Sequence, residues 1–395
     1  MDFGMPTSLT EIVTDGALAQ FDVDATSTTV SGLIESIEFS GVSPEDNARD
    51  AIVDLRINRT GGRSEQGSGT RVAIIRDGQW HWRTARTEPF DIAALNEVQP
   101  ADDLHLRAAR TLFGNAQVFL APHSDGSSSV VALNGTPPTS PLRPALLHGV
   151  ATLDPDVDVY RAIAAFAASR GVGARQTNEG IALSDGTEIV IRNGKVTNVG
   201  GGLSFDDVVA DAFLTSVEHQ FLYDGRFPQA VVSPNLVAGR ALVQPQGQPP
   251  FEVTMQVIVT VTEQTATWAW ADPNLTGSPA AQAAATVRGF AVDNGIPQFL
   301  SPQFSPPLID DYIVAVKPIV GLWTHTVVPL APQTHASVLL GGPQLALPQP
   351  SQAAVDATVA ALDGQDFSAP RRERALGAYA RHRGLTVGPD GSITV

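Results

Sequence analysis

The stretch FEVTMQVIVTVTEQTATWAWADPN, residues 251–274, decides the fold expected for the second half of this 395-residue chain. The run from Val253 to Val261 is rich in β-branched and apolar residues, and a short polar turn separates it from Ala266–Ala271. This pattern predicts a buried antiparallel hairpin. Because successive side chains of a strand point to opposite faces, Trp268 and Trp270 are expected to share one face of the sheet.

A second Trp-x-Trp pair, Trp80-His81-Trp82, follows a strand-like run in the first half. Matching segments recur in the same order in both halves, which indicates an internal duplication with its boundary at Gly200–Gly202. The predicted domains are therefore residues 1–200 and 201–395. The matches are Leu9–Leu18 with Phe205–Leu214, Trp80–Trp82 with Trp268–Trp270, Val118–Pro122 with Val328–Pro332, and Arg161–Gly171 with Arg374–Gly384.

Composition restricts the partners and the compartment. The formal net charge of −16 argues against nucleic acid and anionic membranes as partners. The chain has no Cys, which excludes disulfides and thiolate chemistry. The N-terminal residues lack a signal-peptide pattern and no apolar run is long enough to span a membrane, so a cytoplasmic protein is expected. The abundance of Ala, Val, Gly and Pro, with Arg preferred over Lys, indicates a GC-rich bacterial source.

Hydrophobic periodicity and capping residues predict the main elements. A short helix over 8–20 is followed by strands over 21–39, and residues 228–250 are expected to be irregular apart from one strand over 236–243. The helix over 308–320 is expected to break near Pro318. The other predicted helices cover residues 101–113, 158–170, 205–223, 279–294, 352–362 and 369–383.

The second half resembles an uncharacterised family, a domain of unknown function common in actinobacteria. The resemblance is carried by the helix from Phe205, the strand TWAWADPN (Thr267–Asn274), the Ala-rich helix after it and the step GIPQF (Gly295–Phe299). It covers roughly Phe205 to Leu340. In the first half His81 and Arg83 replace the two alanines of the strand, and the GIPQF step is absent. The resemblance implies an architecture and assigns no catalytic residue.

The tryptophan pairs are the first candidates for a surface that contacts a ligand or partner: Trp80, Trp82, Trp268 and Trp270. The alternative is that these indoles anchor the sheet in the core, since an indole buries a large area. His81 is expected on the opposite face from Trp80 and Trp82, either facing solvent or as a satisfied polar group.

Arginines at the last helix are the second set of candidates. Arg371, Arg372 and Arg374 make this helix basic, and they could contact an acidic partner or pack on the acidic surface of this chain. His325 and His335 are expected on neighbouring strands, where they could meet. The sequence shows no zinc, P-loop or nucleophile-elbow spacing, so no catalytic residue, metal ligand or cofactor is predicted.

The fold expected is α+β, with two tandem pseudo-repeats related by a pseudo-twofold axis. Each repeat has an antiparallel sheet with helices packed on one face. The function expected is non-enzymatic binding of a protein partner or small ligand, in a groove between the halves, by a monomer or dimer. Two alternatives remain open: a hydrolase using dispersed Asp and His residues, and a nucleic-acid accessory protein using the C-terminal arginines.

Overall fold

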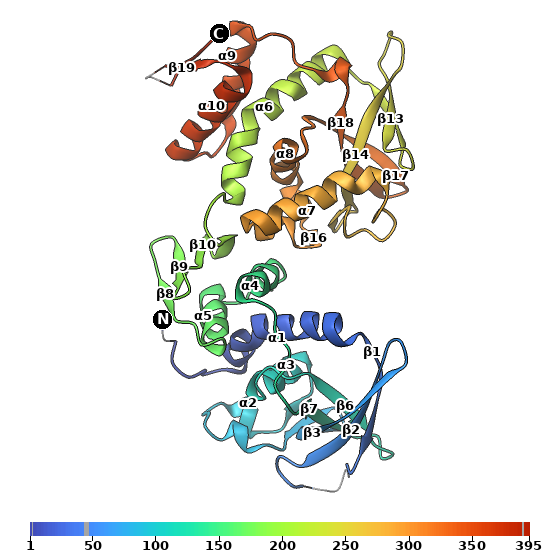
Figure 1. Cartoon of the computed structure of the whole chain (residues 1–395), viewed down its shortest axis with the longest axis vertical. Coiled ribbons are helices and arrows are strands. Elements are labelled where there is room, and N and C mark those ends of the chain that lie inside the picture. Colours follow the sequence, from blue (N-terminus) through green and yellow to red (C-terminus); the bar gives the residue numbers. More distant parts are fainter. Residues whose placement is uncertain (2, 43–46, 389–390) are drawn as a thin grey trace. The chain divides into compact units, whose positions relative to one another are not determined.

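The computed structural model describes the whole chain except residues 2, 43–46 and 389–390 (Figure 1). The described chain divides into two compact units, Met1–Gly200 and Gly201–Val395. Each unit contains helices and an antiparallel sheet, which confirms the predicted α+β class.

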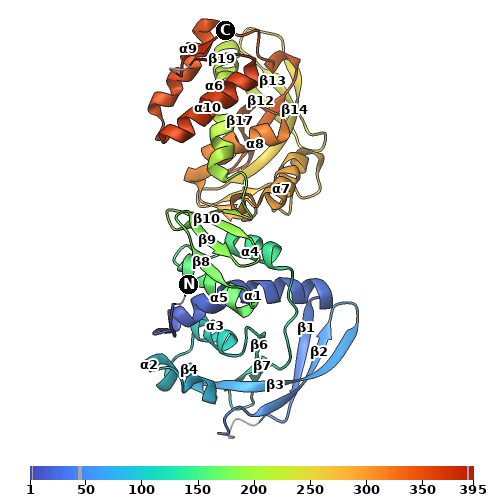
Figure 2. The ribbon, with the colours of Figure 1, turned by 60° about the vertical axis from the view of Figure 1, so that its left-hand side comes forward.

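The first unit builds a seven-stranded sheet in the order β1-β2-β3-β4-β5, with β7 paired to β3 and β6 paired to β7. Helices α1 and α3 lie on the same side of this sheet (Figure 2). The strands are β1 (Ile34–Ser40), β2 (Ile52–Arg59), β3 (Arg63–Arg76), β4 (Gln79–Trp82), β5 (Gln99–Pro100), β6 (Val118–Pro122) and β7 (Ser128–Leu133). The helices are α1 (Leu9–Ser31), α2 (Ala93–Asn96), α3 (Asp103–Leu112), α4 (Leu142–Ala151) and α5 (Val159–Ser169). A four-stranded sheet ends the unit, formed by β8 (Ala174–Gln176), β9 (Gly180–Leu183), β10 (Glu188–Arg192) and β11 (Lys195–Val199).

The second unit repeats the seven-stranded order as β12-β13-β14-β15-β16, with β18 paired to β14 and β17 paired to β18. The strands are β12 (Val231–Asn235), β13 (Arg240–Gln244), β14 (Phe251–Val261), β15 (Ala266–Trp268), β16 (Gln303–Phe304), β17 (Thr324–Ala331) and β18 (Thr334–Gly341). The helices are α6 (Phe205–Arg226), α7 (Gln282–Asn294), α8 (Ile309–Val320), α9 (Gln352–Ala360) and α10 (Ala369–Arg383). A two-stranded sheet of β19 (Thr386–Val387) and β20 (Ile393–Thr394) ends the unit. The turn expected over Pro389-Asp390-Gly391 includes residues outside the described part of the chain.

The two seven-stranded sheets share a register irregularity at the same place. The pairing of β3 with β7 shifts between Arg71 and Ala73, and that of β14 with β18 shifts between Val257 and Val259. A β-bulge is a specific feature, so it serves as a marker for aligning the two sheets. This marker places Ala73 level with Val259.

The bulge changes the equivalence of the tryptophans expected from the sequence. Trp82 pairs with Ala73 and Trp268 pairs with Val259, so Trp82 is level with Trp268. The Trp-x-Trp match is therefore two residues out of register. Trp270 also does not share a strand face with Trp268, because β15 ends at Trp268 and the backbone turns there. The carbonyl of Trp268 accepts hydrogen bonds from the N–H groups of Ala271 and Asp272.

The first helices of the two units begin in the same way. Ser8 caps α1 by accepting a hydrogen bond from the N–H of Glu11 at 3.2 Å. Ser204 caps α6 by accepting one from the N–H of Asp207, also at 3.2 Å. Counting from these caps places Leu9–Val30 of α1 level with Phe205–Arg226 of α6, and Ser31 level with Phe227, the C-cap of α6.

Three predictions of elements are wrong. The first helix does not stop at residue 20 but continues to Ser31, because Val23 and Ser27 extend its buried stripe and tertiary packing overrides their weak helix propensity. Residues 228–250 form two strands, β12 and β13, and Pro234 is tolerated because β12 lies at the sheet edge. Helix α8 runs through Pro318 to Val320.

Candidate functional site

The predicted tryptophan contacts lie mainly in the two cores. Trp80 and Trp268 are both 0 % exposed. The Trp80 ring lies 5.4 Å from that of His105, and the Trp268 ring lies 5.5 Å from that of Tyr312. These two indoles fill the sheet–helix interface and have no surface to offer a partner. Trp80 and Trp268 therefore fit the alternative interpretation, in which the indoles anchor the sheet in the core.

The other two indoles are partly buried and already engaged. Trp82 donates its indole N–H to the carbonyl of Ala94 at 3.0 Å. The guanidinium of Arg288 lies 4.7 Å above the Trp270 ring. Each contact joins residues of one unit, the first for Trp82 and the second for Trp270, so each stabilises its own unit.

His81 lies on β4 opposite Ile74 and is partly buried. Burial, together with the positive charges of Arg83 and Arg76, lowers the pKa of its imidazole. Among the described residues, the His81 ring makes no ring contact or hydrogen bond with Trp80 or Trp82. The three side chains therefore do not form one site.

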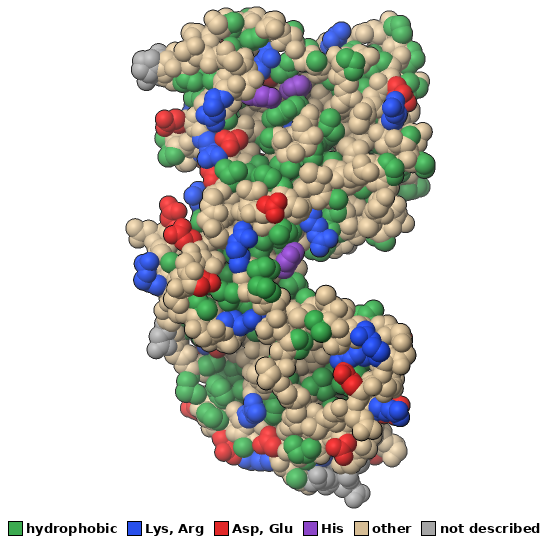
Figure 3. All heavy atoms as spheres, in the orientation of Figure 1, with side chains coloured by type: hydrophobic (Ala, Val, Ile, Leu, Met, Phe, Trp, Pro, Cys, Tyr) green, Lys and Arg blue, Asp and Glu red, His purple; other side chains and the backbone are tan. Residues whose placement is uncertain are grey.

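The three predicted arginines of α10 face acidic side chains of their own unit. Arg374 donates to Asp211 at 2.6 Å, Arg372 donates to Asp363 at 2.7 Å, and Arg371 lies 3.6 Å from Asp206. Basic and acidic side chains lie next to each other on this part of the second unit (Figure 3). The arrangement fits the alternative in which the helix packs on the acidic surface of the chain.

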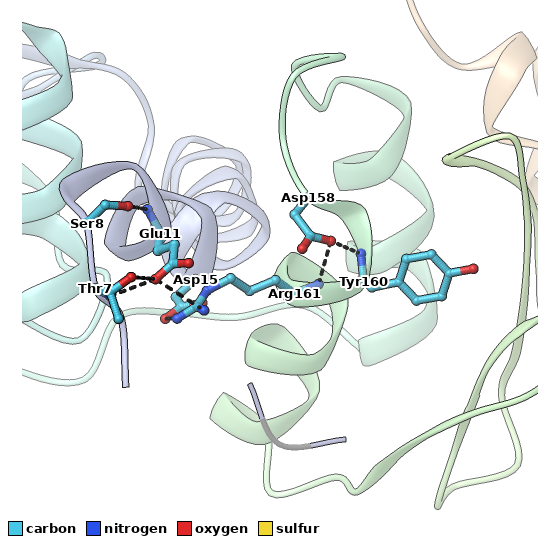
Figure 4. Close-up of polar contacts among 7 residues, drawn as sticks. All are labelled: Thr7, Ser8, Glu11, Asp15, Asp158, Tyr160 and Arg161. Atoms are coloured by element: carbon cyan, nitrogen blue, oxygen red, sulfur yellow. Dashed lines mark hydrogen bonds and ion pairs between the residues drawn. The ribbon is translucent and has the colours of Figure 1, made fainter. Parts of the chain in front are cut away.

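The Arg374 contacts have a counterpart in the first unit. Arg161 on α5 is 5 % exposed and reaches both carboxylate oxygens of Asp15, at 2.7 and 2.9 Å (Figure 4). Its Nη1 lies 3.5 Å from Glu11. Counting from the caps places Asp15 level with Asp211, so each unit ties its first helix to a later helix with an arginine clamp.

A buried lysine is the most unusual charged group of the second unit. Lys317 on α8 is 0 % exposed. Its ammonium donates to Ser216 Oγ at 2.5 Å and lies 3.0 Å from His325 Nδ1. Among the described residues no carboxylate lies within 4.0 Å of it, and burial lowers its pKa to about 7. The group around Lys317 is called the Lys317 cluster and consists of Ser216, His219, Lys317, Trp323 and His325.

The histidines of the Lys317 cluster are held neutral. Burial, and then the charge of Lys317, lowers the pKa of His325 to about 3. Burial first, and then Lys317, His382 and Arg383, lowers the pKa of His219 to about 4. His219 stacks on Trp323 with ring centroids 5.9 Å apart. Histidine side chains are visible, in purple, on the surface of the second unit (Figure 3).

The expected meeting of His325 and His335 does not occur. His325 pairs with Leu339 on the neighbouring strand, whereas His335 pairs with Pro329. The two imidazoles thus belong to opposite ends of the β17–β18 hairpin. Within the part of the chain that the structure describes, no group of three or more His, Asp or Glu side chains is placed to hold a metal ion.

The first unit contains a cavity of about 280 Å³, called here the first-unit pocket. Its helix side is formed by Val23, Ser27 and Ser31 of α1. Its sheet side includes Ile57 and Arg59 of β2, residues 65–68 of β3, Leu133 of β7 and residues 134–138 after it, with Ala116 and Gln117 completing the lining. The volume is near the lower limit of small-molecule sites, which is about 300 Å³.

The same place in the second unit is filled by aromatic side chains. Counting from the caps places Ser27 level with Tyr223 and Ser31 level with Phe227. Tyr223 and Phe227 are 6 % and 4 % exposed, and their rings are 6.0 Å apart. They belong to a hydrophobic cluster of the second unit that also contains Val253 and Met255.

The sheet side of the pocket also has smaller or more polar residues than the matching positions of the second unit. Counting from the shared bulge places Glu65 level with Phe251 and Gly67 level with Val253. The Phe251 ring lies 5.0 Å from that of Phe227, and a Cβ added to Gly67 would meet no atom within 4 Å. The strand order and the bulge are the same in both units, and small or polar residues in the first unit stand at the positions of these aromatic residues and open the pocket.

Sequence reasoning missed the first-unit pocket, although its signal was present in the helix match. Extending the match of Leu9–Leu18 with Phe205–Leu214 at constant spacing would have paired the two serines with Tyr223 and Phe227. The aromatic-to-serine difference would then have been visible as a loss of core volume.

Comparisons with known proteins give one match. The model of an uncharacterised family, Family of unknown function (DUF6882), matches residues 206–343. This confirms that the second half resembles a domain of unknown function. No curated protein and no solved structure matches the chain. In the described residues, no helix has the length and apolar character needed to cross a membrane.

Proposed function

We propose that this protein is a binding protein that evolved by duplication of one α+β unit, and that its first unit holds a small molecule. The observation that carries the proposal is the first-unit pocket, which occupies the position of a packed aromatic cluster in the second unit. A pocket of this kind, with an apolar wall and several polar groups, is the usual form of a small-molecule site.

Duplication is supported by features that a shared fold class alone does not require. Both units have the same order of seven strands, the same bulge, a serine cap on the first helix, and an arginine clamp to a later helix. Two copies of one unit can divide their roles, so that one copy keeps a stable core and the other opens a site.

The experiment compares compounds by thermal unfolding on the wild type, two filled chains and a control chain. The first filled chain carries Gly67→Phe, which places a ring in the pocket from the sheet side. The control chain carries Thr28→Tyr and Val30→Phe, which place rings at exposed positions of α1, outside the pocket. A chemically diverse fragment library is screened against the variants and the wild type.

The proposal expects compounds that raise the unfolding midpoint of the wild type and the control chain and leave the filled chain unchanged. Ser27→Tyr with Ser31→Phe is a second filled chain, made from the helix side, and it should behave like Gly67→Phe. A library in which every stabilising compound acts equally on filled and unfilled chains would overturn the proposal. The expected groove between the halves, the hydrolase activity and the nucleic-acid role stay predictions.

A further inference from the structure

The charges at the first-unit pocket are already neutralised by groups of the protein. Arg59 is 8 % exposed and lies on the inner wall. Its Nε donates to Glu65 at 2.6 Å and its Nη1 donates to the carbonyl of Gly32 at 3.1 Å. A charged ligand entering this pocket would lose hydration and meet a pair whose charges cancel, so its charge would be uncompensated.

The remaining polar groups of the lining are hydroxyls and an amide. Ser27 and Ser31 contribute hydroxyls, whereas Gln117 contributes an amide. Both kinds of group can donate and accept hydrogen bonds, as the hydroxyl groups of a ligand also can. They therefore complement a ligand that carries several hydroxyls.

The apolar part of the lining is aliphatic. It consists of Val23, Ile57, Ala116, Leu133, Pro137 and Pro138. Among the described residues that line the pocket there is no aromatic ring, so a flat ligand finds no stacking partner. The wall suits the C–H surface of a saturated molecule, and 280 Å³ limits that molecule to about the size of a monosaccharide.

We infer that the first-unit pocket takes an uncharged, saturated polyhydroxy compound of monosaccharide size. The inference rests on the proposed function, because it names the ligand class of the same pocket. The acidic charge of the chain, −16, adds a general repulsion of anions.

The test measures binding by titration calorimetry of the whole chain with five probes. Glucose and myo-inositol are the uncharged polyols, glucuronate is the anion, glucosamine is the cation, and benzamide is the flat aromatic compound. The wild type is compared with Gly67→Phe and with the control chain carrying Thr28→Tyr and Val30→Phe.

The expected result is that at least one polyol binds the wild type and the control chain about tenfold or more tightly than either charged sugar. The same polyol should lose its binding to Gly67→Phe. Preferential binding of glucuronate, glucosamine or benzamide, lost in Gly67→Phe, would overturn the ligand class and leave the proposed function intact. If no probe binds, the ligand class is also overturned, and the fragment library decides separately on the pocket.

Discussion

Replacing Lys317 by Met should change the stability of the second unit with a sign that depends on pH. Lys317 is 0 % exposed and its ammonium has only Ser216 and His325 as polar partners at hydrogen-bond distance among the described residues. Burial lowers its pKa from 10.5 to about 7. The folded chain therefore releases the proton of Lys317 at a lower pH than the unfolded chain does.

The size of the effect follows from this difference in pKa. Each pH unit by which the pKa is lowered corresponds to about 1.4 kcal/mol, so charging the buried amine costs the folded state about 5 kcal/mol below pH 7. The sign follows from proton binding. Between pH 7 and 10.5 the unfolded chain binds more protons, so the stability of the wild type rises with pH over this range.

The Met variant removes both the cost and the two polar contacts. Losing the contacts to Ser216 and His325 costs about 2–3 kcal/mol at any pH, while the apolar stem of the side chain is retained. Near pH 6.5 the variant should therefore be more stable than the wild type by about 2 kcal/mol. Near pH 10.5 it should be less stable by a similar amount.

The assay is urea unfolding, followed by circular dichroism, across the pH range from 6.5 to 10.5. The quantity compared is the free energy of unfolding of the variant minus that of the wild type, in which the titration of all other groups largely cancels. Lys195→Met, at an exposed position, is the matched control and should show no change of sign. A Lys317→Met chain that is destabilised equally at both ends of the range would refute the reasoning.

Three further predictions concern other groups. Arg161→Met should lower the free energy of unfolding by about 2–4 kcal/mol, because it removes the cation from a buried pair; Arg374→Met, at a partly exposed pair, should cost about 1 kcal/mol, and Arg372→Met, at an exposed ion pair, under about 0.5 kcal/mol in the same urea assay. Tyr223→Ser with Phe227→Ser should destabilise the second unit by more than about 4 kcal/mol by emptying a packed core, and equal stability of this variant and the wild type in thermal unfolding would count against the equivalence with Ser27 and Ser31. His219→Gln should flatten the loss of stability on acidification from pH 6.5 to about 4, since the lowered pKa of His219 makes the unfolded chain the stronger proton binder there; an unchanged slope of urea midpoints against pH would contradict this.

The helix matches were predictable because each repeats a local pattern. Ser8 and Ser204 are N-caps of helices of 23 and 22 residues, and Arg161 and Arg374 each lie ten residues before a glycine that ends the helix. The ion pairs were not predictable, because each arginine pairs with a residue 146 or 163 positions earlier in the chain. The Trp-x-Trp match failed because a tryptophan pair does not fix the register of a strand. Nine residues separate Ala73 from Trp82 and Val259 from Trp268, so the two hairpins are equally long and only Trp82 and Trp268 are equivalent.

The candidate pocket could not be predicted from motifs, because its signal lies in a comparison of side-chain volumes between the two units. Serine at positions 27 and 31 is unremarkable for a helix on its own. It becomes informative only beside Tyr223 and Phe227, which stand at the matching positions of the second unit. The Lys317 cluster was hidden for a related reason, since burial of a lone lysine depends on the packing of α6, α8 and β17.

The arginine clamps join an early helix of each unit to a helix that is synthesised much later. Arg161 is 146 residues from Asp15, and Arg374 is 163 residues from Asp211. At a translation rate of about 5–20 residues per second, the leading helix emerges on the order of ten seconds before its arginine partner exists. Until then the leading helix can pack only on the earlier helices of its unit, mainly α3 or α8, so an unfinished unit that ends before α5 or α10 leaves part of that helix uncovered and is prone to aggregate.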